Sequence, residues 1–211
     1  MTSKVKRYFL EIKDFSNPVD LNIPKNYKII LDEKKDFQYN KFFYKQIGVD
    51  HYWRDRLAWS EREWFWYVQN NNLETHILKT GKGEEEDLVG FYEQEYHPES
   101  NEVELINMGI LKEFRGLKLG SMLLNHAIAS ASRKNPKRMW VHTCSLDHKH
   151  ALQNYKSKGF EIYKEEDNKK EKLDNICEEC KKEDESVSQN LIMHGYKNCD
   201  SCKISKTIFP V

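Results

Sequence analysis

Residues 104–121 read ELINMGILKEFRGLKLGS, and this stretch decides the fold. Alternating residues predict a strand that ends at about Ile110, a glycine-bearing turn follows, and a helix begins near Gly120. A helix N-terminus presents free backbone N–H groups and the positive end of the helix dipole. Glycines let the backbone come close to phosphate oxygens, and Arg115 and Lys118 add positive charge. The stretch predicts a pyrophosphate-binding loop, although an ordinary turn and helix cap would show the same pattern.

The segments around this loop alternate between strand and helix patterns. Apolar periodicity and turn residues predict strands over 5–12, 27–31, 74–79, 88–96, 102–110, 138–144 and 160–163, and helices over 36–47, 60–70, 120–133 and 148–158. Three consecutive strands joined by tight turns imply an antiparallel meander. The expected fold class is therefore α+β (α/β), with a mixed, mostly antiparallel twisted sheet flanked by helices.

The composition limits the classes of protein that fit. The chain has 211 residues, 34 of them Lys or Arg and 34 Asp or Glu, so the formal net charge is zero. This argues against a protein that mainly coats nucleic acid or an anionic membrane, because phosphate binding depends on excess positive charge. No run of 18 apolar residues exists to cross a membrane, and the apolar run at 8–10 is too short for a signal peptide. We expect a cytoplasmic protein without a membrane partner, and a homo-oligomer stays open.

The zero net charge hides two opposed regions. Residues 112–138 contain seven basic residues and one acidic residue, around the predicted phosphate loop. Residues 84–104 contain nine acidic residues and no Lys or Arg. The positive region would attract an anionic cofactor, and the negative region would attract a cationic substrate that accepts a transferred group.

Two motifs and the order of the elements resemble the GNAT superfamily of acyl-CoA-dependent N-acetyltransferases. The family's loop reads Arg or Gln, two residues, Gly, one residue, then Gly or Ala. Here Arg115 is followed by Lys118 and Gly120 at these positions, so a lysine stands where the family has its first glycine. Residues 155–160, YKSKGF, match the family's signature of Tyr, three residues and Gly-Phe. The resemblance covers residues 27–165.

This resemblance implies a GNAT fold and the transfer of an acetyl group from acetyl-CoA to a primary amine by direct attack in a ternary complex. It also implies that the strand before the loop splays from its neighbour, with the Ile110 N–H polarising the thioester carbonyl. His148 stands where many members place an Asn that contacts CoA. The residues expected to bind the cofactor are Met108, Ile110, Arg115, Gly116, Leu117, Lys118, Leu119, Gly120, Ser121 and His148.

Acetyl transfer to an amine needs a group that takes the amine's proton and a group that protonates the departing thiolate. By resemblance, Tyr155 is the expected general acid, although a packed helix aromatic would fit the sequence as well. Glu104 is the preferred general base, because it precedes Ile110 by six residues and would share its strand face. The rivals for the role of base are Glu93, Glu95 and His142.

The residues between the first two helices usually border the acceptor in this family. Trp53, Arg54 and Trp59 are candidates for an acceptor pocket, and Trp59 could equally belong to the core. The alternative for the basic residues is surface pairing, in which Arg54 and Arg56 meet Asp50 and Asp55.

A single cysteine lies in the strand predicted over 138–144. His142 and Cys144 alternate with Val141 and Thr143, so one of the two pairs must face the core. We expect a buried, neutral Cys144, since the family's usual chemistry is direct attack without an acyl-cysteine.

Four further cysteines form two C-x-x-C pairs, Cys177 with Cys180 and Cys199 with Cys202, separated by 18 residues. This spacing is typical of a four-thiolate Zn²⁺ site. A site closed by four thiolates has no open coordination position, so the expected metal is structural. Two redox pairs or a disulfide-linked tail is the alternative.

The composition changes at Lys164, after which the chain is acidic and poor in apolar residues. We expect a GNAT acetyltransferase domain over 1–164 and a small zinc-ribbon-like extension over 165–211, folded mainly by its metal. The expected partners are a CoA thioester and an amine-bearing acceptor. The second function hypothesis is a non-catalytic acyl-CoA sensor or scaffold whose ribbon engages a protein or nucleic-acid partner.

Overall fold

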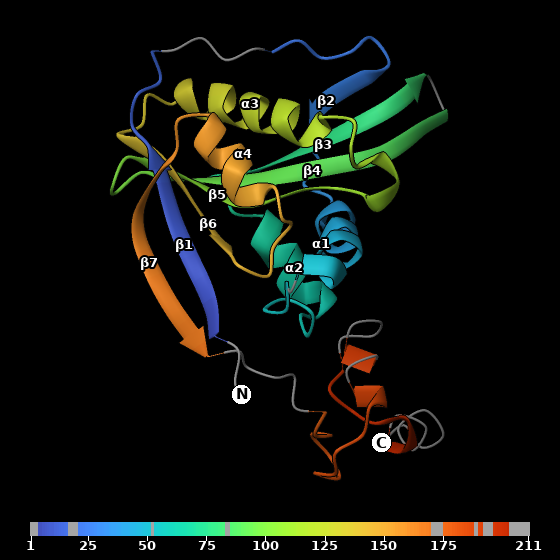
Figure 1. Cartoon of the computed structure of the whole chain (residues 1–211). Coiled ribbons are helices and arrows are strands. Elements are labelled where there is room, and N and C mark those ends of the chain that lie inside the picture. Colours follow the sequence, from blue (N-terminus) through green and yellow to red (C-terminus); the bar gives the residue numbers. More distant parts are fainter. Residues whose placement is uncertain are drawn as a thin grey trace.

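The computed structural model describes residues 4–16, 21–51, 53–82, 85–169, 175–187, 190–191 and 196–202. A seven-stranded sheet with the order β2-β3-β4-β5-β6-β1-β7 runs through the body of the molecule (Figure 1). Neighbouring strands are antiparallel except β5 and β6, which are parallel. The mixed, mostly antiparallel sheet and its β3–β4–β5 meander are confirmed. The strands are β1 (Lys4–Ile12), β2 (Tyr27–Leu31), β3 (Leu73–Lys82), β4 (Glu85–His97), β5 (Glu102–Ile110), β6 (Arg138–Cys144) and β7 (Glu161–Lys169).

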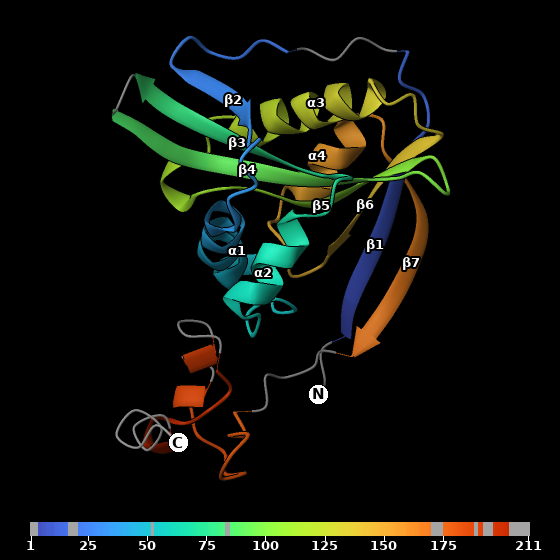
Figure 2. The ribbon, with the colours of Figure 1, turned by 180° about the vertical axis from the view of Figure 1, so that it is seen from behind.

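Helices cover both faces of this sheet. Figures 1 and 2 show α3 and α4 on one face and α1 and α2 on the other. A short 3₁₀ turn, η1 (Lys112–Phe114), leads from β5 towards α3. The helices of the described part of the chain are α1 (Phe37–His51), α2 (Glu61–Val68), α3 (Leu119–Ser132) and α4 (Ala151–Ser157).

Each face of the sheet has its own core, because successive strand residues point to opposite sides. On the α3 face, Leu123 and its apolar neighbours pack with Tyr92 of β4. On the α1 face, the ring of Phe43 stacks on that of Phe91, with 4.7 Å between the centroids. One face of α3 carries an apolar stripe that is buried in this core: Leu123, Leu124, Ala127, Ile128 and Ala131.

A capping box fixes the start of α2. The Ser60 hydroxyl accepts a hydrogen bond from the N–H of Glu63 at 3.3 Å, and the Glu63 carboxylate accepts one from the Ser60 N–H at 2.7 Å. Two donors of the first turn are thereby satisfied. This cap holds α2 beside the aromatic residues that precede it.

The last strand is longer than the sequence pattern predicts. β7 continues to Lys169, paired with β1 along its length, so the expected boundary at Lys164 falls inside the strand. The acidic, solvated side chains of this part of β7 do not show the alternation of a half-buried strand. The strand is held by backbone pairing and by ion pairs such as Lys6 with Glu165. The acidic composition after Lys164 therefore belongs to an edge strand of the sheet and does not mark the end of the folded domain.

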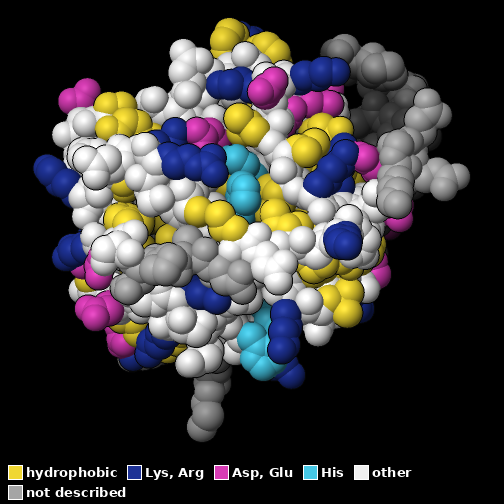
Figure 3. Space-filling model, turned by 90° about the horizontal axis from the view of Figure 1, so that it is seen from above, with side chains coloured by type: hydrophobic (Ala, Val, Ile, Leu, Met, Phe, Trp, Pro, Cys, Tyr) yellow, Lys and Arg dark blue, Asp and Glu magenta, His cyan; other side chains and the backbone are white. Residues whose placement is uncertain are grey.

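Figure 3 shows the molecule from above, over α3. The Lys and Arg side chains on this face are scattered among acidic and apolar ones and do not form a continuous basic surface. None of the helices that the structure describes is long and apolar enough to cross a membrane.

The described residues beyond β7 form a small separate segment below α1 and α2 in Figure 1. Ile176 and Glu183 make an isolated antiparallel bridge. Cys177, Val187 and Cys199 form a buried cluster of their own.

Candidate active site

The parallel strands β5 and β6 separate halfway along their length. Four residue pairs join them, ending at Leu105 opposite Val141, while β5 continues to Ile110. The N–H of Leu111 donates to the carbonyl of Val89 on β4 at 2.9 Å. The N–H and C=O of Ile110 therefore point to the other edge of β5, towards the gap that β6 leaves. This gap is the splay that the resemblance implied.

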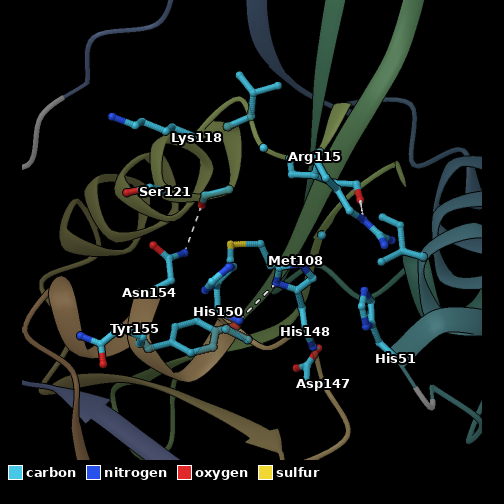
Figure 4. A pocket seen from close by; sticks show the side chains of 18 of the residues that line it. His51, Met108, Arg115, Lys118, Ser121, Asp147, His148, His150, Asn154 and Tyr155 are labelled. Carbon is cyan, nitrogen blue, oxygen red and sulfur yellow. Dashed lines mark hydrogen bonds between the residues drawn. The ribbon is translucent and has the colours of Figure 1, made fainter. Parts of the chain in front are cut away.

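A cleft of about 510 Å³ opens at the gap, between the end of β5, the start of α3 and α4 (Figure 4). Leu117 does not line it and is 57% exposed, because the left-handed residues on either side turn it to solvent. The other predicted cofactor residues all line the cleft: Met108, Ile110, Arg115, Gly116, Lys118, Leu119, Gly120, Ser121 and His148.

The loop reaches α3 through two residues with left-handed backbone. Gly116 has φ of 86°, and Lys118, the N-cap residue of α3, has φ of 60°. This conformation costs an L-residue about 1–2 kcal/mol, whereas glycine adopts it freely. The left-handed backbone at this position thus explains why the family has a glycine there. The chain accepts the strain at Lys118 and gains a positive charge at the helix N-terminus.

Arg115 ties the loop to the end of β5. Its Nε donates to the Ile110 carbonyl at 3.1 Å, and its Nη1 donates to Asp50 Oδ2 at 3.0 Å. Its Nη2 is buried and has no hydrogen-bond partner among the described residues. Because a buried donor without a partner is costly, an anionic group in the cleft would satisfy it. This residue fits a phosphate-bearing cofactor.

Tyr155 of α4 lies on the wall opposite the loop (Figure 4). Its ring packs against Phe160, with 5.7 Å between the centroids, and only 5% of the residue is exposed. Burial, reinforced by the charge of Asp147, raises the pKa of the Tyr155 phenol, so it keeps its proton at neutral pH. Next to it, Asn154 Nδ2 donates to the Gly120 carbonyl at 3.4 Å and joins α4 to the first turn of α3.

The cleft also contains polar residues that the sequence did not single out. The rings of His51 and His148 meet edge to face, with 5.6 Å between the centroids, and burial lowers the pKa of both. Asp147 accepts a hydrogen bond from the His148 N–H at 2.7 Å and so fixes the turn before α4. No motif marks these positions, although Asp147 and Asn154 flank predicted residues. The cleft residues missed from sequence include His51, Asp147, His150 and Asn154.

Helix α1 approaches β5 closely where the strand carries Gly109. A Cβ built there would lie 2.6 Å from Cγ2 of Ile47. Both residues line the cleft. The glycine therefore allows α1 to close the cleft from the opposite side of the sheet.

A bulge in β5 changes the face on which Glu104 lies. The pairing with β4 shifts between Glu93 and Gln94, and the bulge leaves Ile106 without an opposite residue. Glu104 is on the α1–α2 face, whereas the Ile110 side chain packs in the α3 core. The prediction that these two residues share a strand face is wrong, because an inserted residue inverts the alternation.

Glu104 nevertheless has the properties of a base. Its side chain is 19% exposed, and its Oε2 lies 3.2 Å from Nε2 of His97. Burial raises its pKa above the ordinary value of a glutamate. A carboxylate with a raised pKa takes up a proton more readily at neutral pH.

Glu93, a rival for that role, is fully buried and surrounded by donors. Its Oε1 accepts from Asn40 Nδ2 at 2.6 Å. Its Oε2 accepts from Asn107 Nδ2 at 2.7 Å, from the Tyr67 hydroxyl at 3.0 Å and from Arg56 Nη1 at 3.3 Å. A carboxylate engaged by four donors is a structural anchor.

Arg56 lies among aromatic rings between α1 and α2. Its guanidinium carbon is 4.1 Å from the ring centroid of Tyr67 and 4.9 Å from that of Trp59. Its ion pair is with Glu93, so the alternative pairing of Arg56 with Asp50 or Asp55 is wrong. The cation is stabilised by ring faces and a buried carboxylate together.

The remaining candidates on β4 and β6 are less enclosed. Glu95 accepts a hydrogen bond from Asn70 at 2.7 Å. On β6, Val141 faces the core, which leaves His142 exposed and Cys144 half-buried. The expectation of a buried Cys144 is therefore wrong. Partial burial is nevertheless enough to raise the pKa of its thiol, which keeps the thiol protonated.

The four cysteines of the two C-x-x-C pairs come together. Their sulfur atoms all lie within 4.8 Å of one another, and the Sγ atoms of Cys180 and Cys199 are 3.8 Å apart. A tetrahedral Zn²⁺ site with bonds of about 2.3 Å places sulfurs about 3.8 Å apart. All five cysteines are free thiols, so the disulfide alternative is not supported. This geometry fits a metal held by Cys177, Cys180, Cys199 and Cys202.

The thiols of this cluster differ in acidity. Burial alone would raise the pKa of Cys177, but backbone N–H groups near Cys199 and Cys180 bring it down to about 6. A thiolate is the form that binds a metal. From the sequence, His194 is an alternative ligand that four thiols make unnecessary, and it lies outside the described residues.

The fold and the cleft are those of an acyltransferase: a glycine-bearing loop at a helix N-terminus and a protonated tyrosine lie on either side of a backbone N–H in a splayed sheet. The model of the acetyltransferase (GNAT) family matches residues 38–160, more than half of the chain. The chain belongs to this family. A search of curated proteins finds no match.

Solved structures share the fold at low sequence identity. A GCN5-related N-acetyltransferase from Sphaerobacter thermophilus has a TM-score of 0.58 and 11% identity, covering 79% of this chain and 51% of that one. An aminoglycoside acetyltransferase from an uncultured soil metagenomic sample has a TM-score of 0.53 and 13% identity, covering 65% of this chain and 90% of that one. The chain spans about half the length of the first of these structures.

Proposed function

We propose that this enzyme transfers an acetyl group from acetyl-CoA to a primary amine by direct attack in a ternary complex. The observation that supports this most is the single cleft in which the gap beside Ile110, the loop around Lys118 and Tyr155 meet. The acetyl donor supplies the thioester whose carbonyl is attacked. The chain's own groups then have to hold the donor, polarise that carbonyl and move two protons.

The cofactor side is built from backbone and cations. The N–H groups at the start of α3, Lys118 and the unpartnered Nη2 of Arg115 would hold the phosphates. The N–H of Ile110, directed into the gap, would polarise the carbonyl oxygen. Tyr155, kept protonated by burial, would give its proton to the departing thiolate.

The acceptor side lies on the α1–α2 face, where Glu104 would take the amine's proton through water. This carboxylate is preferred because Glu93 is already engaged by four donors. The nine acidic residues between 84 and 104 favour a cationic acceptor. The aminoglycoside acetyltransferase among the similar structures acts on one such class of amine.

The C-terminal cluster would hold one structural Zn²⁺ through Cys177, Cys180, Cys199 and Cys202. Four reduced thiols suit a reducing compartment, so we place the enzyme in the cytoplasm. No coordination position is left for chemistry at this metal.

The test is thiol release from acetyl-CoA across a panel of primary amines: a polyamine, an aminoglycoside, an aromatic amine and a lysine-bearing peptide. We expect turnover with at least one amine, and Tyr155→Phe should lower kcat by about 100-fold with an unchanged Kd for acetyl-CoA, because it removes only the proton. Tyr163→Phe, on exposed β7, is the matched control. Binding of acetyl-CoA without turnover of any amine would instead favour a non-catalytic sensor, and full activity of Tyr155→Phe would remove Tyr155 from the mechanism.

A further inference from the structure

The segment with the four cysteines contacts the helices α1 and α2 of the acetyltransferase domain through Leu191. This residue is 8% exposed, although it lies in a polar part of the chain. It belongs to a buried apolar cluster with Tyr44 of α1, Leu57 of the α1–α2 connection, and Trp64 of α2. A leucine buried between two parts of one chain joins them through the hydrophobic effect.

Leu191 is also held from the side of the cysteines. The neighbouring Asn190 is 5% exposed, and its Nδ2 donates to the Asn198 carbonyl at 3.0 Å and to Asp200 Oδ1 at 2.8 Å. Asn198 and Asp200 flank Cys199. The position of Leu191 is thus fixed by the same turn that supplies one of the four sulfurs.

On the other side, the cluster that Leu191 joins surrounds Arg56. The ring centroids of Tyr44 and Trp64 lie 5.7 and 6.0 Å from its guanidinium carbon. Arg56 bonds to Glu93, and Glu93 bonds to Asn107 of β5, next to the bulge. A continuous series of contacts therefore runs from the cysteine cluster to the strand that borders the acceptor side.

We propose that the four-cysteine segment completes the acceptor side of the active site, with Leu191 as a positioning residue that holds the α1–α2 connection and Arg56 in place when the metal is bound. The inference rests on the proposed function for the identity of the acceptor side. The contact at Leu191 itself does not depend on it. The cofactor loop lies across the sheet from this contact, so the segment acts on the amine and not on acetyl-CoA.

The test compares Leu191→Ala with Ile176→Ala, a matched change at a 39% exposed residue of the same segment. Both variants should keep one metal ion by native mass spectrometry. Leu191→Ala should speed amide exchange over 57–68 and shift tryptophan emission to longer wavelength, because Trp64 gains water. With the panel amine that is turned over fastest, its amine KM should rise five- to tenfold, with kcat and the Kd for acetyl-CoA unchanged. Removing the metal from the unmodified enzyme with a chelator should produce the same changes.

The outcomes separate the two proposals. If no amine is turned over, exchange and emission still decide whether the segment holds the α1–α2 connection. Unchanged exchange and emission in Leu191→Ala would overturn the contact. Changed exchange with an unchanged amine KM would overturn the role at the acceptor side, and a change in the Kd for acetyl-CoA would move the effect to the cofactor loop.

Discussion

At the scale of single residues, two carboxylates of the α1–α2 face have very different surroundings. Glu93 is buried under four donors, whereas Glu104, two pairs further along the same face, contacts only His97 among the charged and hydrogen-bonding side chains that the structure describes. These surroundings make Glu93 an anchor and leave Glu104 as the base that we propose. Sequence spacing alone cannot separate them, because both are strand glutamates.

The raised pKa of Glu104 leads to a prediction about pH. Burial favours the protonated carboxyl, so the base loses function at a higher pH than an ordinary glutamate with a pKa of about 4.3 would. The acidic limb of kcat/KM, measured from pH 4 to 8 with the best panel amine, should therefore lie above that value. In Glu104→Gln the limb should disappear and the rate at pH 7 should fall by about 100-fold.

Glu95→Gln is the control for this experiment, because Glu95 already accepts a hydrogen bond from Asn70. It should keep most of the rate, with the limb moved slightly towards lower pH, because the negative charge of Glu95 contributes to the raised pKa of Glu104. An unaltered pH profile in Glu104→Gln would assign the base to another group.

Motifs predict residues well where the backbone itself sets the requirement. Except for Leu117, the residues of the loop from Arg115 to Ser121 and Tyr155 line the cleft as predicted, because a helix N-terminus and a signature motif are local in sequence. His51 was not found, since it reaches the cleft only through the packing of α1 on β5. The left-handed backbone at Lys118 was not predicted, because a lysine rarely adopts this conformation.

At the scale of elements, alternation and turn residues predicted the strands, and β2, β5 and β6 have the expected bounds. The bulge in β5 was not predicted, because no residue type in that stretch marks an extra residue in one strand. It is nevertheless the feature that assigns Glu104 to the α1–α2 face. The existence of helices and strands can be predicted from the local sequence pattern. The register of paired strands depends on contacts between distant segments, which a local pattern does not contain.

The close approach of α1 and β5 gives a prediction at this scale. Gly109→Ala should lower the free energy of unfolding by about 1–3 kcal/mol, because the new Cβ would lie 2.6 Å from Cγ2 of Ile47. Adding Ile47→Ala should recover part of this loss, so that the double variant is less destabilised than the sum of the single ones. Urea unfolding followed by circular dichroism measures all of them.

Gly120→Ala is the control, because the nearest atom to its Cβ would be 3.9 Å away. It should unfold within about 0.5 kcal/mol of the unmodified enzyme. Additive losses at Gly109 and Ile47 would show that the contact is not a steric one.

At the scale of the whole molecule, the sheet and the cysteine segment obtain their stability from different sources. The sheet buries two apolar cores, while the described part of the segment buries few apolar residues: Val187 with Cys177 and Cys199, and Leu191 against α1 and α2. Removing the metal should therefore unfold the described residues of the segment (175–187, 190–191 and 196–202) and leave the sheet folded. Amide exchange should show fast exchange over these residues and protection over β3, β4 and β5.

Cysteine variants check the same point. Cys199→Ser should lose the metal, and Cys144→Ser, outside the cluster, should keep it. Native mass spectrometry of each variant measures the metal content. Retention of one ion by Cys199→Ser would argue against a four-thiolate site.

The unexpected length of β7 has a consequence for how the cysteine segment is tethered. The strand ends at Lys169 and the segment resumes at Asn175, so the connection spans at most about 20 Å even if fully extended. A tether this short keeps the local concentration of Leu191 near α2 in the millimolar range. A contact too weak to join two separate proteins is then enough to hold the segment against α2. A longer connection would lower the fraction of molecules in which Leu191 is docked, although every atom of the contact itself would be unchanged.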